Sequence, residues 1–461
     1  MRALKRIIRG LVPRPLLFGY HYVLNWVSMA LAGFPTRSLI TIGVTGTNGK
    51  TSVVSYISDL LESAGFRTGY VSTATIKVGS VKRLNQLKMT MPGRWTLARM
   101  LRYIKKSGAR YAIIETSSQG LEMGRHLGIS YDIAVFTNLT PEHVEAHGSF
   151  ENYRAAKEKL FKALSKGKRK KDVKKIIVAN IDDANARYFL QYDADQKWGY
   201  SLGVDQAALP GMVVRPVEYA CGPKGISFTL KDQQGQTAHI QSSLIGIFNL
   251  NNMLAAATVA MSQGISLDKI KVALEKLEGV PGRMEPIDEG QDYSVIVDYA
   301  VVPESLELVY KTLREQLGPN KKLIAVLGSA GGGRDVAKRP KLGALAARYA
   351  YRAAVTNEDP YDEEPMNIIK QVARGLEQAG KIKGRDYVTL LNRKTAIAWA
   401  LKQAGSGDIV VITGKGCEPV IIAANGKRIP HDDRTVAREF LQEQLQRARL
   451  KANQEPVQQQ S

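Results

Sequence analysis

The chain has 461 residues, more than one hydrophobic core usually supports, so we expect two or three domains. Its hydrophobic share of 44% and charged share of 23% are those of a globular protein and exclude global disorder. The net charge of +22 favours anionic substrates or an anionic surface, but the one dense basic block, Lys166 to Lys175, has no interleaved aromatic residues. We therefore expect a solvated loop there and no nucleic-acid partner.

The two cysteines, Cys221 and Cys417, lie far apart and lack the spacing of metal ligands. A chain with no disulfide framework suits a reducing compartment. We therefore expect a cytoplasmic protein.

Residues 1 to 38 are too few for a domain but carry a pattern. Their basic and apolar residues fall on two sides of a predicted amphipathic helix: Arg2, Lys5, Arg6 and Arg9 against Leu4, Ile7, Ile8 and Leu11. Pro13 and Pro15 are expected to interrupt this helix, and the apolar run from Leu16 to Leu31 is short for a membrane span. Two alternatives stay open: packing on the protein's own core, or peripheral contact of residues 1 to 14 with an anionic membrane.

The stretch from Leu39 to Ser52, LITIGVTGTNGKTS, predicts a strand, a glycine loop and the start of a helix. Gly46 and Gly49 allow a backbone conformation and a close approach that side chains would block. In such a loop, backbone N–H groups and a helix N-terminus bind phosphate oxygens. Lys50 is then expected at the outer phosphates of a nucleotide and Thr51 at Mg²⁺.

The general phosphate-loop pattern has a glycine where Val44 stands, so a glycine-rich turn that binds nothing is the alternative. The string TGTNGKTS nevertheless resembles the signature of the Mur ligase family, whose members use ATP to join an amino acid or peptide to a carboxylate. By this resemblance, the residues of the string expected to contact ATP are Gly46, Thr47, Asn48, Gly49, Lys50, Thr51 and Ser52.

Strand and helix patterns then alternate, with a helix over 96–106 and strands over 110–115 and 132–139, which predicts a parallel sheet covered by helices. Glu115 ends one of these strands. Its carboxylate is therefore expected at the carboxyl edge of the sheet, beside the glycine loop, where it could bind Mg²⁺.

The segment from Thr137 to Phe161 passes two histidines, His143 and His147, before it enters a helix. Their spacing of four would suit a metal pair on a helix, but the adjacent Gly148 argues against that geometry. The resemblance to the Mur ligases instead implies that His143 and Glu115 hold Mg²⁺, with Thr51. It also implies that Lys157 is carbamylated by CO₂ and bridges toward a second metal ion.

After a predicted strand from Ile176 to Asn180, the residues up to about Gly246 alternate and carry many turns, which predicts a β-rich insertion. A helix follows that bears Asn249 and Asn252. In the resembling family this helix lies beside the adenine, and the alternative for Asn249 is a helix cap.

Gly and Pro cluster from Leu277 to Glu285, which marks a domain boundary, and strands near 294–297, 323–327, 353–356 and 408–412 predict a second α/β domain. We expect a segment 1–38, a central ATP-binding domain 39–282, a C-terminal domain 283–450 and a disordered tail 451–461. The fold class is therefore α/β: a P-loop-type parallel-sheet ATPase domain with a β-rich insertion, then a Rossmann-like C-terminal domain.

The resemblance extends over residues 39 to 450. It implies that Arg283 and Asp298 of the C-terminal domain complete the nucleotide site when that domain closes. It also implies contacts to the carboxylate and amino acid substrates from Thr90, Ser117, Ser118, Asp359, Tyr361, Gly416 and Glu418.

The family branch that this chain most resembles is the UDP-N-acetylmuramoyl-tripeptide synthetases, with three departures. Only 38 residues stand where those enzymes have a uridine-binding domain. The arginine that follows Asp-Pro in the loop for meso-diaminopimelate is Tyr361 here, followed by acidic residues, which favours a cationic amino acid such as lysine. Two histidines of the family's motifs are replaced by Val301 and Gln119.

The expected activity is that of an ATP-dependent carboxylate–amine ligase, which adds an amino acid to a muropeptide-type peptidoglycan precursor through an acyl phosphate. Its cofactors would be ATP and two Mg²⁺ ions, and its catalytic residues Lys50, His143, Lys157 and Arg283. The alternatives are a related ligase for a lipid-linked, polyglutamate or folate-type carboxylate, and a nucleotide-binding scaffold without ligase activity. We expect it in the cytoplasm, with peripheral contact at the inner face of the membrane as the open alternative for residues 1 to 14.

Overall fold

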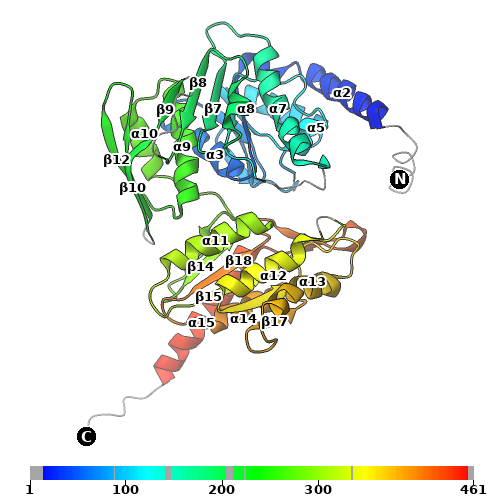
Figure 1. Ribbon diagram of the computed structural model, residues 1–461, viewed down its shortest axis with the longest axis vertical. Helices are drawn as coiled ribbons and strands as arrows, with labels where there is room; N and C mark the ends of the chain where they lie inside the picture. The colour runs from blue at the N-terminus through cyan, green and yellow to red at the C-terminus, as the bar shows by residue number, and fades with distance from the viewer. Residues whose placement is uncertain are drawn as a thin grey trace. The chain divides into compact units, whose positions relative to one another are not determined.

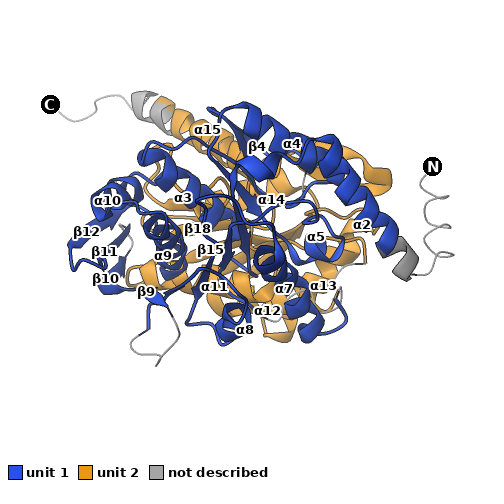
Figure 2. Cartoon of the chain, turned by 90° about the horizontal axis from the view of Figure 1, so that it is seen from above, with its two compact units in different colours: residues 1–278 blue, residues 279–461 orange. Residues whose placement is uncertain are grey.

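The computed structural model describes residues 14–87, 89–140, 147–203, 211–222, 225–333 and 336–454. The chain divides into two compact units, residues 1–278 and 279–461, and each is built around its own sheet (Figures 1 and 2). The boundary between them falls within the Gly- and Pro-containing segment from Leu277 to Glu285.

The first unit contains a nine-stranded sheet that is parallel except at one edge, where β3 and β4 run antiparallel. Four of its strands are buried along their whole length, as is usual when helices cover both sides of a parallel sheet. The strands in sheet order are β4 (Val81–Leu84), β3 (Thr75–Val78), β2 (Thr68–Val71), β5 (Tyr111–Glu115), β1 (Ile40–Thr45), β6 (Ile133–Phe136), β7 (Ile176–Asn180), β8 (Gln196–Tyr200) and β9 (Met212–Val214).

Helices cover both faces of this sheet (Figure 1). One face carries α3 (Lys50–Ser63), α9 (Ile247–Ser262) and α10 (Leu267–Glu275). The other carries α4 (Arg94–Lys106), α5 (Ser118–Glu122), α7 (Phe150–Lys166) and α8 (Ala186–Leu190).

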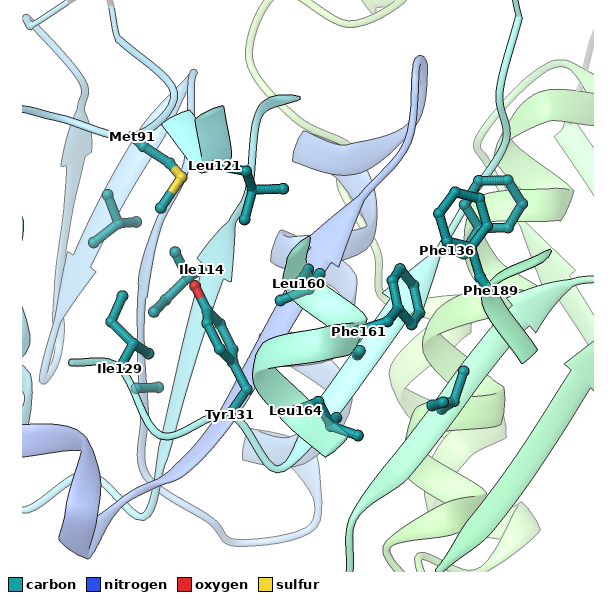
Figure 3. Close-up of a cluster of buried hydrophobic side chains, with 14 of the residues drawn as sticks. Met91, Ile114, Leu121, Ile129, Tyr131, Phe136, Leu160, Phe161, Leu164 and Phe189 are labelled. Carbon is teal, nitrogen blue, oxygen red and sulfur yellow. The ribbon is translucent and has the colours of Figure 1, made fainter. Parts of the chain in front are cut away.

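The core under the second group of helices is rich in aromatic rings (Figure 3). Phe189 of α8 lies with its ring centroid 4.4 Å from that of Phe136 in β6 and 4.8 Å from that of Phe161 in α7. Leu160 and Leu164 of α7 and Tyr131 are fully buried beside them. This packing fixes α7, and with it Lys157, against the strands that carry the candidate site.

A small antiparallel sheet follows β9, where the sequence predicted a β-rich insertion. It consists of β10 (Pro216–Gly222), β11 (Gly225–Lys231) and β12 (Thr237–Ser242). Because β8 and β9 join the nine-stranded sheet, the insertion proper is limited to these three strands and the residues around them.

Helix α2 (Arg14–Leu31) packs against α4, so the described part of the N-terminal segment belongs to the first unit. Its residues Asn25, Ser28 and Met29 are buried, and Asn25 Nδ2 donates to the carbonyl of Met123 at 2.7 Å. Pro15 lies in the first turn of this helix, where proline is tolerated. The interruption that Pro13 and Pro15 were expected to cause concerns the segment before α2, so it stays a prediction. Residues 1–13, predicted as a basic amphipathic helix, lie outside the described residues.

No described helix combines the length and the apolar character that crossing a bilayer requires.

The basic block from Lys166 to Lys175 is only partly the solvated loop that the sequence predicted. Two of its lysines turn inward to the fully buried Asp132: Lys170 makes a short ion pair with this carboxylate, and Lys175 Nζ lies 3.4 Å from its Oδ1. The remaining basic residues of the block are exposed.

The second unit contains a six-stranded sheet, parallel except for its edge strand β13. The strands in sheet order are β13 (Glu285–Pro286), β14 (Ser294–Asp298), β18 (Ile409–Thr413), β15 (Leu323–Leu327), β16 (Arg352–Thr356) and β17 (Tyr387–Leu390). A separate two-stranded ribbon pairs β19 (Val420–Ile422) with β20 (Arg428–Pro430).

Helices also cover the second sheet on both faces. One face carries α11 (Pro303–Gln316), α12 (Lys338–Tyr349) and α13 (Pro365–Gln378), and the other α14 (Arg393–Gln403) and α15 (Asp433–Gln454). Residues 451–454 of the tail that was predicted to be disordered continue α15, and residues 455–461 lie outside the described residues. The predicted α/β class is confirmed for both units.

Candidate active site

The glycine loop connects β1 to α3 at the carboxyl edge of the first sheet, and two of its glycines leave no room for a side chain. A Cβ on Gly46 would lie 1.9 Å from Thr137 Oγ1, and one on Gly49 would lie 2.3 Å from Asn252 Oδ1. Gly49 also has a φ of 81°, which favours glycine, and no side chain caps α3. The N-terminus of α3 therefore has no side-chain cap, and such a helix end is where anions bind.

Two lysines meet at one carbonyl of this loop. Lys50 Nζ donates to the Gly46 carbonyl at 3.0 Å and to the Thr47 carbonyl at 2.7 Å. Lys157 Nζ, on α7, donates to the same Gly46 carbonyl at 2.7 Å and lies 4.4 Å from the centroid of the Tyr153 ring. Two residues that are 107 positions apart are thus brought to the same end of the loop. Both were predicted from sequence.

Glu115, at the end of β5, is only 2% exposed and accepts three hydrogen bonds. Thr51 Oγ1 donates to its Oε2 at 3.0 Å. Thr73 donates to Oε2 through its backbone N–H at 2.6 Å and to Oε1 through its hydroxyl at 2.8 Å. The Thr73 hydroxyl also lies 2.9 Å from that of Thr90. A continuous polar chain therefore runs from Thr51 in the glycine loop to Thr90.

His147 is buried between α5 and α7. Its Nε2 lies 3.1 Å from the Ser118 hydroxyl and its Nδ1 3.3 Å from Glu122 Oε2. Burial lowers the pKa of His147, while Glu122 raises it. Ser117 acts as the N-cap of α5, because its hydroxyl accepts from the Gly120 N–H at 3.1 Å. His143 lies outside the described residues.

The part of the chain that the structure describes contains no cluster of three or more His, Cys, Asp or Glu side chains arranged to hold a metal ion. The oxygens of Thr51 and Glu115 are hard donors, which is the chemistry that Mg²⁺ requires. The residues present therefore fit this ion as part of a set that ATP phosphates and the region of His143 would complete.

The two asparagines of α9 have different surroundings. Asn252 lies against Gly49, as the Cβ distance above shows. Asn249 donates to the Ile245 carbonyl at 2.9 Å and accepts from the Tyr56 hydroxyl at 3.3 Å. Asn252 is thus the one that reaches the glycine loop, and Asn249 holds the start of the helix.

Sequence reasoning missed several residues that build this edge. Asn138 accepts from the Asn48 N–H through its side chain and from the Thr47 N–H through its carbonyl, both at 2.8 Å. Thr73 links Glu115 to Thr90, as described above. Both residues follow strand ends, β6 and β2, and that position was the signal available in the sequence.

Two arginines of the first unit, Arg94 and Arg125, were also missed. Arg125 donates to the Met91 carbonyl in a short hydrogen bond, and Arg94 Nη2 lies 2.6 Å from His21 Nδ1. Arg94 Nη1 is buried without a hydrogen-bond partner. Burial lowers the pKa of Arg125, and the neighbouring Arg94 guanidinium lowers it further. Two close guanidinium groups, one with an unused buried donor, suit an anionic group of a substrate.

In the second unit, two residues predicted to bind the nucleotide, Arg283 and Asp298, lie at the carboxyl end of β14. Asp298, at the end of β14, accepts backbone N–H bonds from Met284 at 2.8 Å and Ala300 at 2.7 Å. Burial raises the pKa of Asp298, while Arg283 lowers it. The Arg283 guanidinium lies 4.3 Å from the centroid of the Tyr299 ring.

The predicted amino acid residues of the second unit surround a buried lysine that sequence reasoning missed. Lys415 Nζ donates to Asp359 Oδ1 at 2.8 Å and to Glu418 Oε2 at 2.6 Å. Burial lowers the pKa of Lys415, but Glu418 and Asp359 raise it by more, so the ammonium is held charged. Gly416 is in the left-handed region with a φ of 52°, and its Cβ would lie 2.8 Å from the Gly282 carbonyl.

The acidic residues after Tyr361 are used by the protein itself, which removes the basis for expecting a cationic amino acid there. Glu363 forms an ion pair with the buried Arg339 at 2.9 Å. Asp362 accepts from the Asn425 N–H at 2.8 Å, and Glu364 caps α13 through the Met366 N–H at 3.2 Å. The Tyr361 backbone has a φ of 53° and donates to the Ile422 carbonyl at 3.0 Å.

With this geometry described, comparison with known proteins identifies the class. Residues 44–260 match the model of the Mur ligase middle domain, and residues 282–416 match that of the Mur ligase glutamate ligase domain. The chain is 38% identical over 416 residues to the UDP-N-acetylmuramoyl-L-alanyl-D-glutamate--2,6-diaminopimelate ligase of Geobacillus kaustophilus. The aligned residues are 90% of this chain and 81% of that protein. The enzyme of the same name from Bacillus velezensis is 38% identical over 395 residues, 86% of this chain and 77% of that protein.

Solved structures agree. A ligase of the same name matches with a TM-score of 0.59 and 33% identity over 88% of this chain and 79% of that one. Folylpolyglutamate synthase of Mycobacterium tuberculosis, with ADP, matches with a TM-score of 0.63 over 84% of this chain and 90% of that one, but at 18% identity, so it shares the fold alone.

The chain belongs to the Mur ligase family. It is an ATP-dependent acid–amino-acid ligase, as the sequence predicted, and its family uses ATP and Mg²⁺.

Proposed function

We propose that the protein adds 2,6-diaminopimelate to a UDP-N-acetylmuramoyl dipeptide, a precursor of peptidoglycan. The observation that carries this proposal is the polar chain from Thr51 through Glu115 and Thr73 to Thr90. It connects the loop expected to hold ATP with the residues expected to hold the acceptor carboxylate. The identity of 38% to ligases named for this reaction supports the same substrates.

The first step is phosphoryl transfer to the acceptor carboxylate. One carboxylate oxygen attacks the γ-phosphorus of ATP, the bond to ADP breaks, and an acyl phosphate forms. The N–H groups after Gly49 and the ammonium of Lys50 stabilise the charge on the transferring group. Ser117, Ser118 and Thr90 orient the acceptor, and Arg94 with Arg125 receives an anionic part of it.

Mg²⁺ would be held by Thr51, Glu115 and His143, with a second ion reached by Lys157 as its carbamate. When bound, these ions supply charge neutralisation for the phosphoryl transfer. The burial of Lys157 against the Gly46 carbonyl supports this role, because conversion to a carbamate would replace a cation with oxygen donors beside the loop. The family resemblance implies a contact between Asn252 and the adenine, and the Asn252 side chain lies against Gly49 of the glycine loop.

The second step is amide formation. The amine of the amino acid attacks the acyl carbon, a proton leaves the nitrogen, and phosphate is expelled. Gly416 and Glu418 receive the amino acid backbone, and Lys415 fixes Glu418 and Asp359 in place. Tyr361 lines the side-chain end of the pocket. By the family resemblance, Arg283 and Asp298 would also contact the nucleotide, and exclusion of water would protect the acyl phosphate.

The proposed location is the cytoplasm, where ATP is present. Residues 1 to 14 remain a proposed point of peripheral contact with an anionic membrane, since Arg2, Lys5, Arg6 and Arg9 give the segment a cationic side. No nucleic acid is proposed as a partner.

The test is phosphate release from ATP in the presence of UDP-N-acetylmuramoyl-L-alanyl-D-glutamate and each of diaminopimelate, lysine and ornithine. We expect release that depends on both the dipeptide and the amino acid and is fastest with diaminopimelate. Arg94→Ala should raise KM for the dipeptide by about tenfold and leave KM for ATP unchanged.

Other outcomes separate the alternatives. Release that needs neither substrate would indicate a nucleotide-binding scaffold. Release that requires a folate or polyglutamate carboxylate would indicate a different ligase of this fold, and a clear preference for lysine would overturn the choice of amino acid.

A further inference from the structure

The positive charge of the protein is concentrated in the first unit. Residues 1–278 contain 38 Lys and Arg against 20 Asp and Glu, whereas residues 279–461 contain 27 against 23. The first acidic residue of the chain is Asp59. The binding of anionic substrates does not explain this uneven positive charge, because both units are expected to bind them.

Many of these cations lie at the amino-terminal edge of the nine-stranded sheet. The strands β2, β5, β1, β6, β7 and β8 are parallel, so they all begin at this edge. Exposed basic residues come just before four of them: Arg67, Arg110, Arg37 and Lys174. The helix α4, which runs back along the sheet, ends there with exposed Lys105 and Lys106, and Lys168 and Lys171 follow the end of α7.

Asp172 and Asp193 are the exposed acidic residues at this edge for which no ion pair is described, and they stand against the eight exposed cations named above. Asp132 is buried and paired with Lys170 and Lys175, which leaves the other lysines of the block without that partner. Asp195 is paired with Arg169 at 2.6 Å. The net charge that this edge presents to solvent is therefore strongly positive.

Exposed apolar side chains adjoin the same edge, at the end of α2. Leu31 is 70% exposed and Trp26 is 55% exposed. Trp26 packs edge-on against Phe34, with ring centroids 5.4 Å apart, and the Arg37 guanidinium lies 3.9 Å from the Phe34 centroid. An exposed Trp and Leu beside arginine and lysine are the composition of a membrane-interface anchor.

We propose that this amino-edge surface, formed by the exposed cations above with Trp26 and Leu31, docks on an anionic lipid bilayer. A nucleic acid fits less well, because arginines already cover the aromatic faces that bases would stack on: Arg37 lies over Phe34, and Arg110 lies 4.7 Å from the centroid of Phe66. The glycine loop and Glu115 lie at the opposite edge of the same sheet. Docking therefore leaves the candidate active site accessible.

The surface consists of described residues and is independent of residues 1 to 14 and of the ligase activity. The test uses the full chain and co-sedimentation with vesicles of phosphatidylglycerol and phosphatidylcholine. The edge variant changes Lys105, Lys106, Lys171 and Lys174 to Gln. The matched control makes the same four changes at exposed lysines of the second unit, Lys311, Lys383, Lys394 and Lys402.

A lysine near an anionic surface contributes roughly fivefold to binding at low salt, so we expect the edge variant to partition at least about tenfold more weakly and the control to change little. Trp26→Ala should weaken partitioning with an unchanged salt dependence, because it removes an apolar contact and no charge. Vesicles of phosphatidylcholine alone should leave all variants in the supernatant.

Equal partitioning of the edge variant and the control would overturn the inference. So would loss of all binding on deletion of residues 1 to 13 with no effect of the four edge substitutions, which would assign the contact to that segment instead. Tighter, salt-sensitive binding to duplex DNA than to anionic vesicles, lost in the edge variant, would show that the surface takes a polyanion rather than a bilayer.

Discussion

The two sheets present their carboxyl edges in different ways. At the edge of the first unit, Glu115 is held by two threonines, and Lys50 and Lys157 both donate to backbone carbonyl oxygens. At the edge of the second unit, the corresponding polar side chains form buried ion pairs: Lys415 with Asp359 and Glu418, and Arg393 with Asp433.

This difference suits phosphate binding at the first edge and the holding of loops in place at the second. A contact between a lysine and a neutral carbonyl can be exchanged for a stronger, charge-assisted contact with a phosphate group. Lysine and arginine that are already paired with carboxylates hold loops in one conformation instead. The first edge is therefore suited to bind a charged substrate group, and the ion pairs of the second edge hold its loops in one conformation.

The strongest test of the first half of this comparison is Lys50→Ala. We expect ligation to fall by about a thousandfold, ~4 kcal/mol of transition-state stabilisation, since an ammonium is lost from the phosphate site. ADP release at saturating substrates measures this. Thermal unfolding should change little, as it should in the control Lys311→Ala, an exposed lysine of the second unit. Near-normal turnover in Lys50→Ala would remove this lysine from the mechanism.

The second half of the comparison is tested by Asp433→Asn. Arg393 and Asp433 are both fully buried, and their guanidinium and carboxylate groups approach to 2.7 Å. Because the change leaves Arg393 buried without its charge partner, we expect a loss of about 3 kcal/mol in the free energy of unfolding. Urea titration followed by circular dichroism measures it.

The matched control is Asp386→Asn, which breaks the ion pair with exposed Arg385 at the surface and should have little effect. Equal stability of the two variants would mean that the buried pair does not fix the second edge.

Lys157→Ala examines whether the second lysine of the first edge acts as a carbamate. We expect about a hundredfold lower activity, because a ligand beside the loop is lost, and partial recovery with added acetate, which can supply the missing oxygens. Lys162→Ala, on the exposed side of the same helix, is the control. Full activity of Lys157→Ala would make this lysine a purely structural residue.

Two buried aspartates, one in each unit, are expected to make the stability of the two units depend on pH in opposite directions. Burial raises the pKa of Asp59 in the first unit to about 6, from its usual 3.8. In the second unit, burial raises the pKa of Asp433, but Arg393 lowers it by more, so it lies well below the usual range. The folded first unit therefore binds a proton that the unfolded chain releases, and the second does the reverse.

From these shifts, stability contributed by Asp59 is present below pH 3.8 and is lost as pH rises toward 6, by about 3 kcal/mol. Stability contributed by Asp433 is present above the unfolded pKa and is lost as pH falls below it. Urea unfolding at several pH values should therefore show a decline between pH 4 and 6 that Asp59→Asn removes. An unchanged profile in Asp59→Asn would show that this carboxyl is not the group responsible.

The sequence predicted those parts of the site that lie in one continuous stretch. The glycine loop and the position of Glu115 at a strand end follow from local pattern, because periodicity and glycine spacing determine them. Thr73 and Lys415 were missed because no local pattern reveals their partners. Thr73 contacts Glu115, 42 positions away, and Lys415 contacts Asp359, 56 positions away. The acidic loop after Tyr361 was misjudged for the same reason: Arg339, 24 positions earlier, already neutralises Glu363.

The close contacts of the glycine loop also constrain how this protein can change over evolutionary time. Gly46 is closed off by Thr137 and Gly49 by Asn252, two residues on different elements of the fold. A larger residue in the loop is tolerated only if its partner first becomes smaller, and at Gly49 the positive φ opposes the change even then. Each glycine and its partner are therefore expected to vary together, with the partner changing first, and Gly49 is expected to vary least.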